Sequence, residues 1–447
     1  MSRLRSYVAG AGLGPFMIRA AMGSSAIQAA GMLLTFLVGI QLARGLGASG
    51  YGHYGIAMAV IAIASIPGEF GLPKLVTREV ASASASGDQS RLAGVIRWAD
   101  RMSLLIALPL AAIIGLGSFL MLRYISAPVG TAIALGAPII PLIALTRIRG
   151  GALQGLHFLV LGQIPVDLLR PLLLALLLLA LFTLDPGAEA PQAIALNALT
   201  AATALVVAHH WLHARLPRPR PARTAQPGRR WLASTIPMAM TDGMRMLQPQ
   251  VGVLLLGIWA AATQVGLFRV ALSTMAMIAV PISLANSIAA PVLAKLHAEG
   301  DMRRLQQLSR RSAQAMVVGV LALSLPFLLI GDRLLEIVFG AEFGGAWPSL
   351  LVLCLGQLVS AGFGPNATLL NMTGHERRVT RAMALAVASN LSALLLLVPS
   401  LGPLGAAWAS MVGLSIWNYL LWQDARRLLA VNTSFLPIRP GRIEGSA

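Results

Sequence analysis

The amino-acid sequence predicts an all-α polytopic membrane protein with about twelve transmembrane helices in two parallel-repeat six-helix lobes. Hydrophobic residues make up 57% of the 447 residues and charged residues only 11%, whereas soluble domains carry about 25% charged residues. Basic residues alternate between successive loops, and the second half of the chain repeats features of the first. The apolar composition excludes a disordered chain, and the single cysteine, Cys354, excludes a disulfide scaffold.

Twelve stretches are apolar and close to the roughly 20 residues that a helix needs to cross the hydrocarbon core of a bilayer. They cover residues 20–42, 51–70, 98–122, 131–153, 160–184, 191–212, 231–258, 264–291, 313–330, 347–370, 379–398 and 404–423. Several contain Gly or Pro, which helices packed together in a membrane tolerate. The first stretch is longer than the apolar region of a signal peptide, so we expect it to be a membrane span.

Basic residues outnumber acidic ones, and their positions predict the topology. The net charge is +18, from 34 Lys and Arg against 16 Asp and Glu. The odd-numbered loops hold only Arg44, Arg123 and Arg333, whereas the even-numbered loops and both ends hold most of the others. Because cytoplasmic loops are rich in Lys and Arg, we expect the even-numbered loops and both termini to be cytoplasmic. Such basic clusters also attract anionic membrane lipids, at about 1 kcal/mol per residue.

One basic segment, residues 217–230, is also rich in proline and lies near the middle of the chain. It is short and lacks interleaved aromatic residues, so no nucleic-acid partner is expected. A Pro/Arg-rich cytoplasmic linker between two halves is the better interpretation.

The two halves that this linker separates share short features in the same order. The matched positions are Gly52 with Gly266, Gly87-Asp88 with Gly300-Asp301, Arg91-Leu92 with Arg304-Leu305, Gly155 with Gly374, and Trp211 with Trp422. Each half holds an even number of spans, so both halves cross the membrane in the same direction, as in transporters that bind substrate between their halves. We expect an N-terminal lobe over residues 1–216, the linker over 217–230, a C-terminal lobe over 231–430 and a cytoplasmic tail over 431–447.

The sequence lacks the motifs of several enzyme classes. Lys74 and Lys295 are the only lysines and neither follows glycine, so there is no phosphate-binding loop for ATP hydrolysis. Neither a His-Glu-x-x-His motif nor paired cysteines are present, and we expect neither a metal nor another cofactor. His209, His210 and His213 end the sixth span; capping of the helix end at the membrane surface is favoured over a metal or proton role.

Charged residues inside membrane spans are costly and often functional. Asp167 and Arg170 lie in the fifth span, and Asp242 and Arg245 lie in the seventh. In each pair the residues are three apart, which places them on one face of an α-helix. Two interpretations remain open: a self-neutralising pair inside the bundle, or a polar cavity between the halves in which an arginine exchanges its carboxylate for a phosphate.

Arg269, near the start of the eighth span, has no acidic partner at helical spacing, so it either snorkels to the membrane surface or faces the same cavity. Uncharged polar residues within spans suit sugar hydroxyls, although they more often bond neighbouring helices. We select Gln248, Gln250 and Asn390 from them as cavity candidates, since position 390 is near the counterpart of Arg170 in the repeat. The other intramembrane amides are Gln28, Gln154, Gln163, Asn197, Asn286 and Gln357.

Several short stretches, in order along nearly the whole chain, resemble a known family. They include Leu42-Ala43-Arg44-Gly45-Leu46-Gly47, Gly50-Tyr51-Gly52, Thr77-Arg78-Glu79-Val80-Ala81, Gly266-Leu267-Phe268, Glu299-Gly300-Asp301 and Phe339-Gly340. The sequence is similar to the bacterial polysaccharide transporters, the O-antigen and capsule flippases of the multidrug/oligosaccharidyl-lipid/polysaccharide (MOP) superfamily. Lipid II flippases of the same superfamily usually add two C-terminal spans, for which residues 424–447 are too polar.

This resemblance implies a MATE-like fold that works by alternating access. It implies a transporter, and not an enzyme, that moves an undecaprenyl-diphosphate-linked oligosaccharide across the bacterial cytoplasmic (inner) membrane during lipopolysaccharide O-antigen or capsule synthesis. The expected partners are that lipid, anionic membrane lipids and polysaccharide assembly proteins, with the transporter itself a monomer. The candidate cavity residues are Arg170, Arg245, Arg269, Asp167, Asp242, Gln248, Gln250 and Asn390.

Two other functions are weighed against this one. A multidrug or cation antiporter of the same superfamily should carry unpaired carboxylates in the membrane, but both intramembrane aspartates have an arginine at helical spacing. A membrane-embedded glycosyltransferase or polymerase would need acidic catalytic residues in a sizeable loop, and the odd-numbered loops are short.

Overall fold

The computed structural model describes residues 13–120, 126–216 and 228–436, with side chains from residue 23 onward apart from 228–230, 232–238 and 241. Of the predicted linker, 217–230, residues 217–227 lie outside these ranges and the last three residues belong to α10; residues 437–447 of the predicted tail also lie outside them. The helices of the first half are α2 (Leu13–Glu69), α3 (Leu72–Ser86), α4 (Gln89–Leu120), α5 (Ala127–Gly136), α6 (Ile139–Gly155), α7 (Leu159–Gln163), the π-helical turn η1 (Ile164–Leu169), α8 (Arg170–Leu184) and α9 (Ala190–His213). Those of the second half are α10 (Gly228–Trp259), α11 (Ala262–Ile278), α12 (Val280–Ala298), α13 (Met302–Phe339), the 3₁₀ turn η2 (Ala341–Ala346), α14 (Trp347–Phe363), α15 (Asn366–Met372), α16 (Glu376–Leu401) and α17 (Pro403–Leu428).

The all-α membrane fold is confirmed. In the described part of the chain, ten segments are long and apolar enough to cross a membrane. The first, Gly23–Ser86, includes two predicted spans, which meet at Gly47. The seventh predicted span lies in α10, which is not among the ten. The protein is therefore a multi-pass membrane protein, and its helices are consistent with about twelve spans.

The break between the first two spans depends on one glycine. Gly47 has φ +65° and ψ 177°, within what is otherwise continuous helix. Side chains with a β-carbon rarely adopt this positive φ, so glycine permits the two spans to meet without a longer loop. We call this end of the bundle the Gly47 end and the opposite end, where α3 lies, the α3 end.

Proline and glycine also divide several other spans. The fourth span consists of α5 and α6, separated at Ala137-Pro138, and the eighth consists of α11 and α12, separated at Ala279. A proline within a helix removes one backbone donor and displaces the preceding turn. In the fifth span, which contains Pro165, the chain passes through the π-helical turn η1 before α8 begins.

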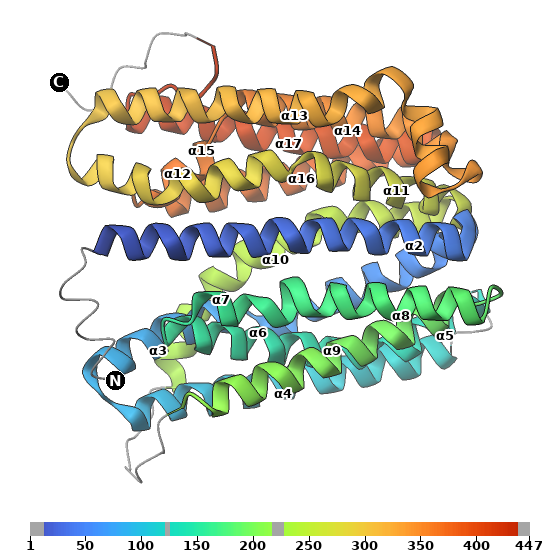
Figure 1. Ribbon diagram of the computed structural model, residues 1–447, viewed down its shortest axis with the longest axis horizontal. Helices are drawn as coiled ribbons and strands as arrows, with labels where there is room; N and C mark the ends of the chain where they lie inside the picture. The colour runs from blue at the N-terminus through green and yellow to red at the C-terminus, as the bar shows by residue number, and fades with distance from the viewer. Residues whose placement is uncertain (1–12, 121–125, 217–227, 437–447) are drawn as a thin grey trace.

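The helices form two groups (Figure 1). Helices α3–α9 lie on one side and α11–α17 on the other, with α2 running between them and contacting both groups. The large apolar core cluster includes residues of both groups. Large apolar side chains also cover the outer surface; Leu105 is 69% exposed and Ile113 66%. Such side chains would contact lipid in a membrane.

Helix α10 links the two groups. At its beginning the Trp231 indole Nε1 donates to the Glu79 carboxylate at 3.3 Å, and its ring centroid lies 5.4 Å from that of Trp98. Further along, α10 packs against α16 and α17 of the other group. One helix thus begins against α3 and α4 of the first half and further along lies between α2 and the second group.

Two sequence-matched positions adopt the same local geometry. The Asp88 carboxylate accepts the backbone N–H of Arg91 at 2.9 Å, and the Asp301 carboxylate accepts that of Arg304 at 2.9 Å. Both aspartates cap a helix in the turn between the second and third span of their half. This equivalence supports the internal repeat, while the exact lobe boundaries stay predictions.

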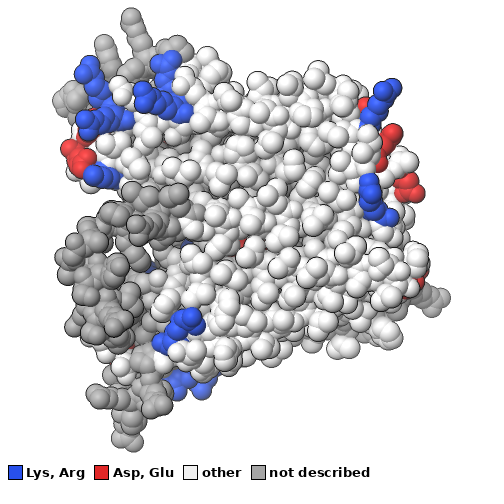
Figure 2. Space-filling model, in the orientation of Figure 1, with Lys and Arg blue, Asp and Glu red and all other residues white. Residues whose placement is uncertain are grey.

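Charged side chains gather at the two ends of the bundle. Figure 2 shows mostly Lys and Arg with a few acidic side chains at the α3 end, a mixture of basic and acidic side chains at the Gly47 end, and a broad band between them with almost no exposed charge. We expect this uncharged band to lie in the hydrocarbon core of the membrane, because exposed charges there are costly.

Candidate functional site

Two neighbouring cavities lie between the groups of helices. The larger has a volume of about 830 Å³ and the smaller about 350 Å³. Both are lined by Val166, Asp167 and Arg245, so they meet at these residues. The walls of the larger cavity come from α2, η1, α8 and α9 of the first half and from α10, α11 and α12 of the second. This is the place where parallel-repeat transporters bind their substrates.

The larger cavity carries an excess of positive charge. Arg170, Arg245 and Arg269 line it, with Asp167 as the one carboxylate among its described lining residues. Each arginine comes from a different helix, namely α8, α10 and α11. Guanidinium groups that line one cavity are suited to phosphate, because each is able to donate two parallel hydrogen bonds.

Arg170 is held in place by a short chain of hydrogen bonds. Its Nη2 donates to Asn197 Oδ1 at 2.9 Å, and Asn197 Nδ2 donates to the Tyr54 hydroxyl at 2.9 Å. Asn197 and Tyr54 are both buried. Asn197 therefore orients the guanidinium without neutralising its charge.

Arg269 lies in the cavity wall and does not snorkel to the membrane surface. Its guanidinium carbon is 6.0 Å from the centroid of the Tyr51 ring, within the range of a cation–π contact. Its buried Nε has no hydrogen-bond partner among the described residues. An arginine with an unused donor beside a cavity is able to bind an anion there.

The interpretation of the two Asp-x-x-Arg motifs as self-neutralising pairs is wrong. Among the described residues, no ion pair joins Asp167 to Arg170 or Asp242 to Arg245. Asp167 lies in the π-helical turn, whose wider turn changes the relation between residues three apart. Asp242 instead binds Lys74, whose Nζ lies 2.6 Å from its Oδ1.

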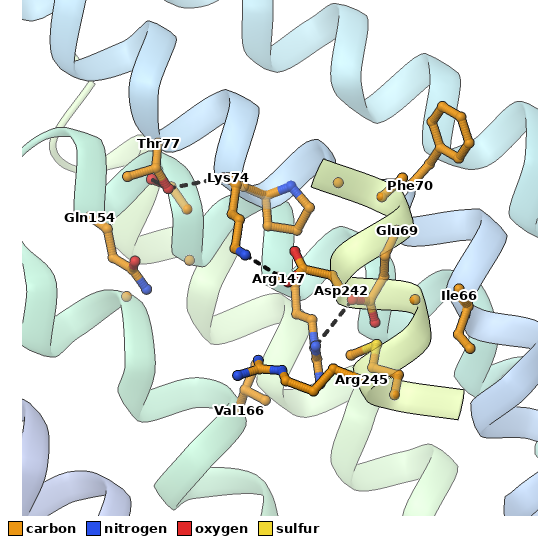
Figure 3. Close-up of a pocket in the computed structure, with 18 of the residues that line it drawn as sticks. Ile66, Glu69, Phe70, Lys74, Thr77, Arg147, Gln154, Val166, Asp242 and Arg245 are labelled. Carbon is orange, nitrogen blue, oxygen red and sulfur yellow. Dashed lines mark hydrogen bonds and ion pairs between the residues drawn. The ribbon is translucent and has the colours of Figure 1, made fainter. Parts of the chain in front are cut away.

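Two ion pairs line the smaller cavity (Figure 3). Besides the Lys74–Asp242 pair, Arg147 Nη1 lies 3.1 Å from Glu69 Oε2. The described charged residues that line this cavity are three basic and three acidic, namely Lys74, Arg147, Arg245, Glu69, Asp167 and Asp242. Gln154 and Gln163 add amide groups to its wall. The smaller cavity is therefore polar but balanced in charge.

Sequence reasoning missed Glu69, Lys74 and Arg147. The two basic residues were assigned to the topology of cytoplasmic loops, whereas their side chains line the cavity. A signal was present: Glu69 and Arg147 fall inside the predicted spans 51–70 and 131–153, and opposite charges inside spans point to a contact.

Two predicted site residues lie elsewhere. Gln248 and Asn390 line neither of the two cavities, whereas Gln250 lines the larger one. Asn390 is 3% exposed and packs against Gly413, where α16 meets α17. The repeat placed position 390 near the counterpart of Arg170, but its side chain lies within the second group of helices.

The histidines at the end of α9 contact each other and a neighbouring arginine. The ring centroids of His209 and His213 are 4.3 Å apart, and Arg149 Nε donates to His209 Nδ1 at 3.4 Å. In the described part of the chain, no three His, Cys, Asp or Glu side chains come together as a metal site would require.

Comparison with known proteins identifies the family. The model of the polysaccharide biosynthesis protein family matches residues 19–297, more than half of the chain. The chain belongs to this family. One relative, Stage V sporulation protein B of Bacillus subtilis (strain 168), is 23% identical to the chain over 440 residues, covering 92% of the chain and 84% of that protein.

Solved structures share the fold of this family member. An inward-facing multidrug resistance MATE family transporter of the MOP superfamily matches with a TM-score of 0.70 at 14% identity, covering 91% of this chain and 97% of that one. The lipid II flippase MurJ, in an inward closed conformation, matches with a TM-score of 0.68 at 13% identity, covering 88% of this chain and 85% of that one. The predicted MATE-like, MOP-type fold is thereby confirmed.

Proposed function

We propose that the protein is a flippase that moves a polyprenyl-diphosphate-linked oligosaccharide across the bacterial cytoplasmic membrane by alternating access, during the synthesis of a surface polysaccharide. The observation that carries this proposal is the cavity between the two groups of helices, lined by Arg170, Arg245 and Arg269. Membership of the polysaccharide biosynthesis protein family and a fold shared with a lipid II flippase support it.

The larger cavity is the proposed site of the diphosphate. Three guanidinium groups face one carboxylate there, so the site favours an anion with more than one negative charge. Asn197 already holds Arg170 in position, and this preorganisation reduces the cost of ordering the side chain when a ligand binds.

The smaller cavity is the proposed site of the sugars. Four of the six described charged residues that line it form the Lys74–Asp242 and Glu69–Arg147 pairs, and Gln154 and Gln163 provide amide donors and acceptors for hydroxyl groups. The volumes of about 830 and 350 Å³ fall in the range of about 300–1,000 Å³ that small-molecule sites occupy. The polyprenyl chain would remain in the lipid, because its burial in a charged cavity is unfavourable.

A cation antiporter fits the same cavity less well. In the larger cavity three arginines line the wall together with Asp167, and their excess of positive charge opposes the binding of a cation. In the smaller cavity Glu69 and Asp242 are already bound to Arg147 and Lys74. We further propose that anionic lipids bind at the basic α3 end. The protein is proposed to be a monomer with both termini in the cytoplasm.

A flipping assay with purified protein in liposomes tests this function. The probe is a polyprenyl-diphosphate disaccharide carrying a fluorophore on the sugar, and dithionite added outside reduces only outward-facing probe. We expect the wild-type protein to expose the protected half of the probe with time. R170A, R245A and R269A should each slow this exposure, whereas R310A, a change at an exposed arginine of α13 outside both cavities, should not. A wild-type rate equal to that of protein-free liposomes contradicts the proposal.

A further inference from the structure

At the Gly47 end, the two halves touch through a reciprocal pair of glycines. A β-carbon at Gly52 would overlap the carbonyl oxygen of Ala262, and a β-carbon at Gly266 would overlap that of Ala48. Gly52 and Gly266 are the positions that the sequence repeat matches. The contact is therefore made twice, once from each half, and neither position has room for a larger residue without backbone movement.

Hydrogen bonds close the same seam. Arg44 Nε donates to the carbonyl of Val338 at 2.9 Å, and its Nη2 donates to that of Ile337. In the other direction, the Glu342 carboxylate accepts the backbone N–H of Ala48 at 2.8 Å. These bonds attach the corner between the first two spans to the end of α13 and to η2. We call this set of contacts the Gly52–Gly266 seam.

The seam lies directly beside the larger cavity. Tyr51 precedes Gly52, and Arg269 follows Gly266 by one turn of α11, and both line the cavity. The Tyr51 hydroxyl lies 3.2 Å from Ser273 Oγ, which joins the two halves again. A β-carbon at Gly55 would lie 2.9 Å from Cγ of Arg269, so the arginine stem of the second half packs on the backbone of the first.

We propose that the Gly52–Gly266 seam is the gate that closes the cavity at the Gly47 end, and that Arg269 couples this gate to anion binding. In the closed state the Arg269 guanidinium contacts Tyr51 across the seam. An anion in the cavity binds the guanidinium through charge-assisted hydrogen bonds, which are stronger than a cation–π contact at 6.0 Å. Arg269 then leaves Tyr51, and the seam loses one of its contacts. This proposal rests on the proposed function in one respect, namely that the anion is the diphosphate of the transported lipid.

Spin labels across the seam test the gate. Ser49 and Thr263 are exposed and adjacent to the contacting residues Ala48 and Ala262, so labels on S49C and T263C in a C354A background report separation of the halves. We expect strong dipolar broadening in the labelled parent and its loss in G52A and in G266A. G117A is the matched control, because a β-carbon at this helical glycine meets nothing within 4 Å.

Folding failure and coupling are tested in the same samples. R44A removes two seam hydrogen bonds without adding volume, so it should also reduce the broadening if either glycine variant fails to purify as a monodisperse protein. Inorganic pyrophosphate, the anion probe, should reduce the broadening in the parent but not in R269Q. Unchanged broadening in folded G52A, G266A and R44A would overturn the gate, and a parent that ignores pyrophosphate would overturn the coupling.

The two proposals fail separately. A wild-type protein that does not flip the polyprenyl-diphosphate probe, yet opens its seam with pyrophosphate, contradicts the proposed function and supports the gate. A protein that flips the probe while its seam ignores both the glycine substitutions and pyrophosphate supports the function and contradicts the gate.

Discussion

Lys74 binds Asp242 at 2.6 Å and thereby joins α3 of the first half to α10 at the α3 end of the bundle. The side chains are 56% and 26% exposed, so water screens the pair. Exposed pairs of this kind contribute about 0.2–1 kcal/mol. The contact is therefore weak enough to break and re-form during the alternating access that we propose.

A double-mutant cycle measures this pair. K74A, D242A and the double variant should give a coupling free energy of unfolding below about 1 kcal/mol. The measurement is thermal unfolding in detergent at low salt and again at high salt, where the coupling should decrease. A coupling of several kcal/mol that does not change with salt would show that the pair is a fixed structural bond.

The Glu69–Arg147 pair should behave differently. The Glu69 side chain is only 10% exposed, against 37% for Arg147. Removing one partner of a buried pair leaves an uncompensated charge and costs about 3–5 kcal/mol at full burial. We expect R147A to lower the free energy of unfolding by roughly 2–3 kcal/mol, since burial is partial. The double variant E69Q/R147A should recover most of this loss in thermal unfolding, and an equally unstable double variant would contradict the explanation.

Asn197 is expected to act on the substrate through Arg170. Loss of a hydrogen bond to a charged group costs about 1.5–3 kcal/mol, so N197A should slow probe flipping by roughly ten-fold or more. T200A is the control, because the buried Thr200 hydroxyl only donates to the backbone carbonyl of Asn197. R170K should retain part of the rate if charge alone matters and none of it if two parallel hydrogen bonds are needed. Normal flipping by N197A would remove Asn197 from the site.

The orientation of the protein follows from its basic residues and is open to direct measurement. Gly187 is exposed between α8 and α9, and Arg303 is exposed at the start of α13. In a C354A background, a membrane-impermeant thiol reagent should label G187C in intact cells and R303C only after permeabilisation. The reverse pattern would invert the predicted topology.

Most of the fold could be predicted from the sequence, because long apolar stretches and the Lys/Arg bias are signals spread over many residues. All three candidate arginines could also be found from the sequence, because a charge inside a membrane span is rare. The partners of these charges could not be predicted. Asp242 binds Lys74, which is far away in the sequence, and such a contact cannot be predicted from the spacing of nearby residues.

The same reasoning fails where helices are irregular or where charges lie at span ends. Asp167 lies in a π-helical turn, so its spacing of three residues from Arg170 does not place the two side chains on one face as it would in an α-helix. Lys74 and Arg147 were interpreted as basic residues of cytoplasmic loops. That interpretation gave no reason to expect their side chains in the cavity wall, where they lie. Asn390 was predicted to line the cavity but does not. The sequence repeat indicates its approximate depth in the membrane but not the direction of its side chain, which is buried.

The path of α10 has a consequence for how tightly an anion is held. This helix begins against Trp98 and Glu79 of the first half, packs against α16 and α17 further on, and carries Arg245 between these contacts. Any rotation of one half against the other must tilt or bend α10, and Arg245 moves with it while Arg170 stays bonded to Asn197. If the protein works by the proposed alternating access, the spacing of the arginines, and with it the affinity for a diphosphate, will depend on the angle between the halves. The movement that exposes the ligand on the far side of the membrane would then also weaken its binding.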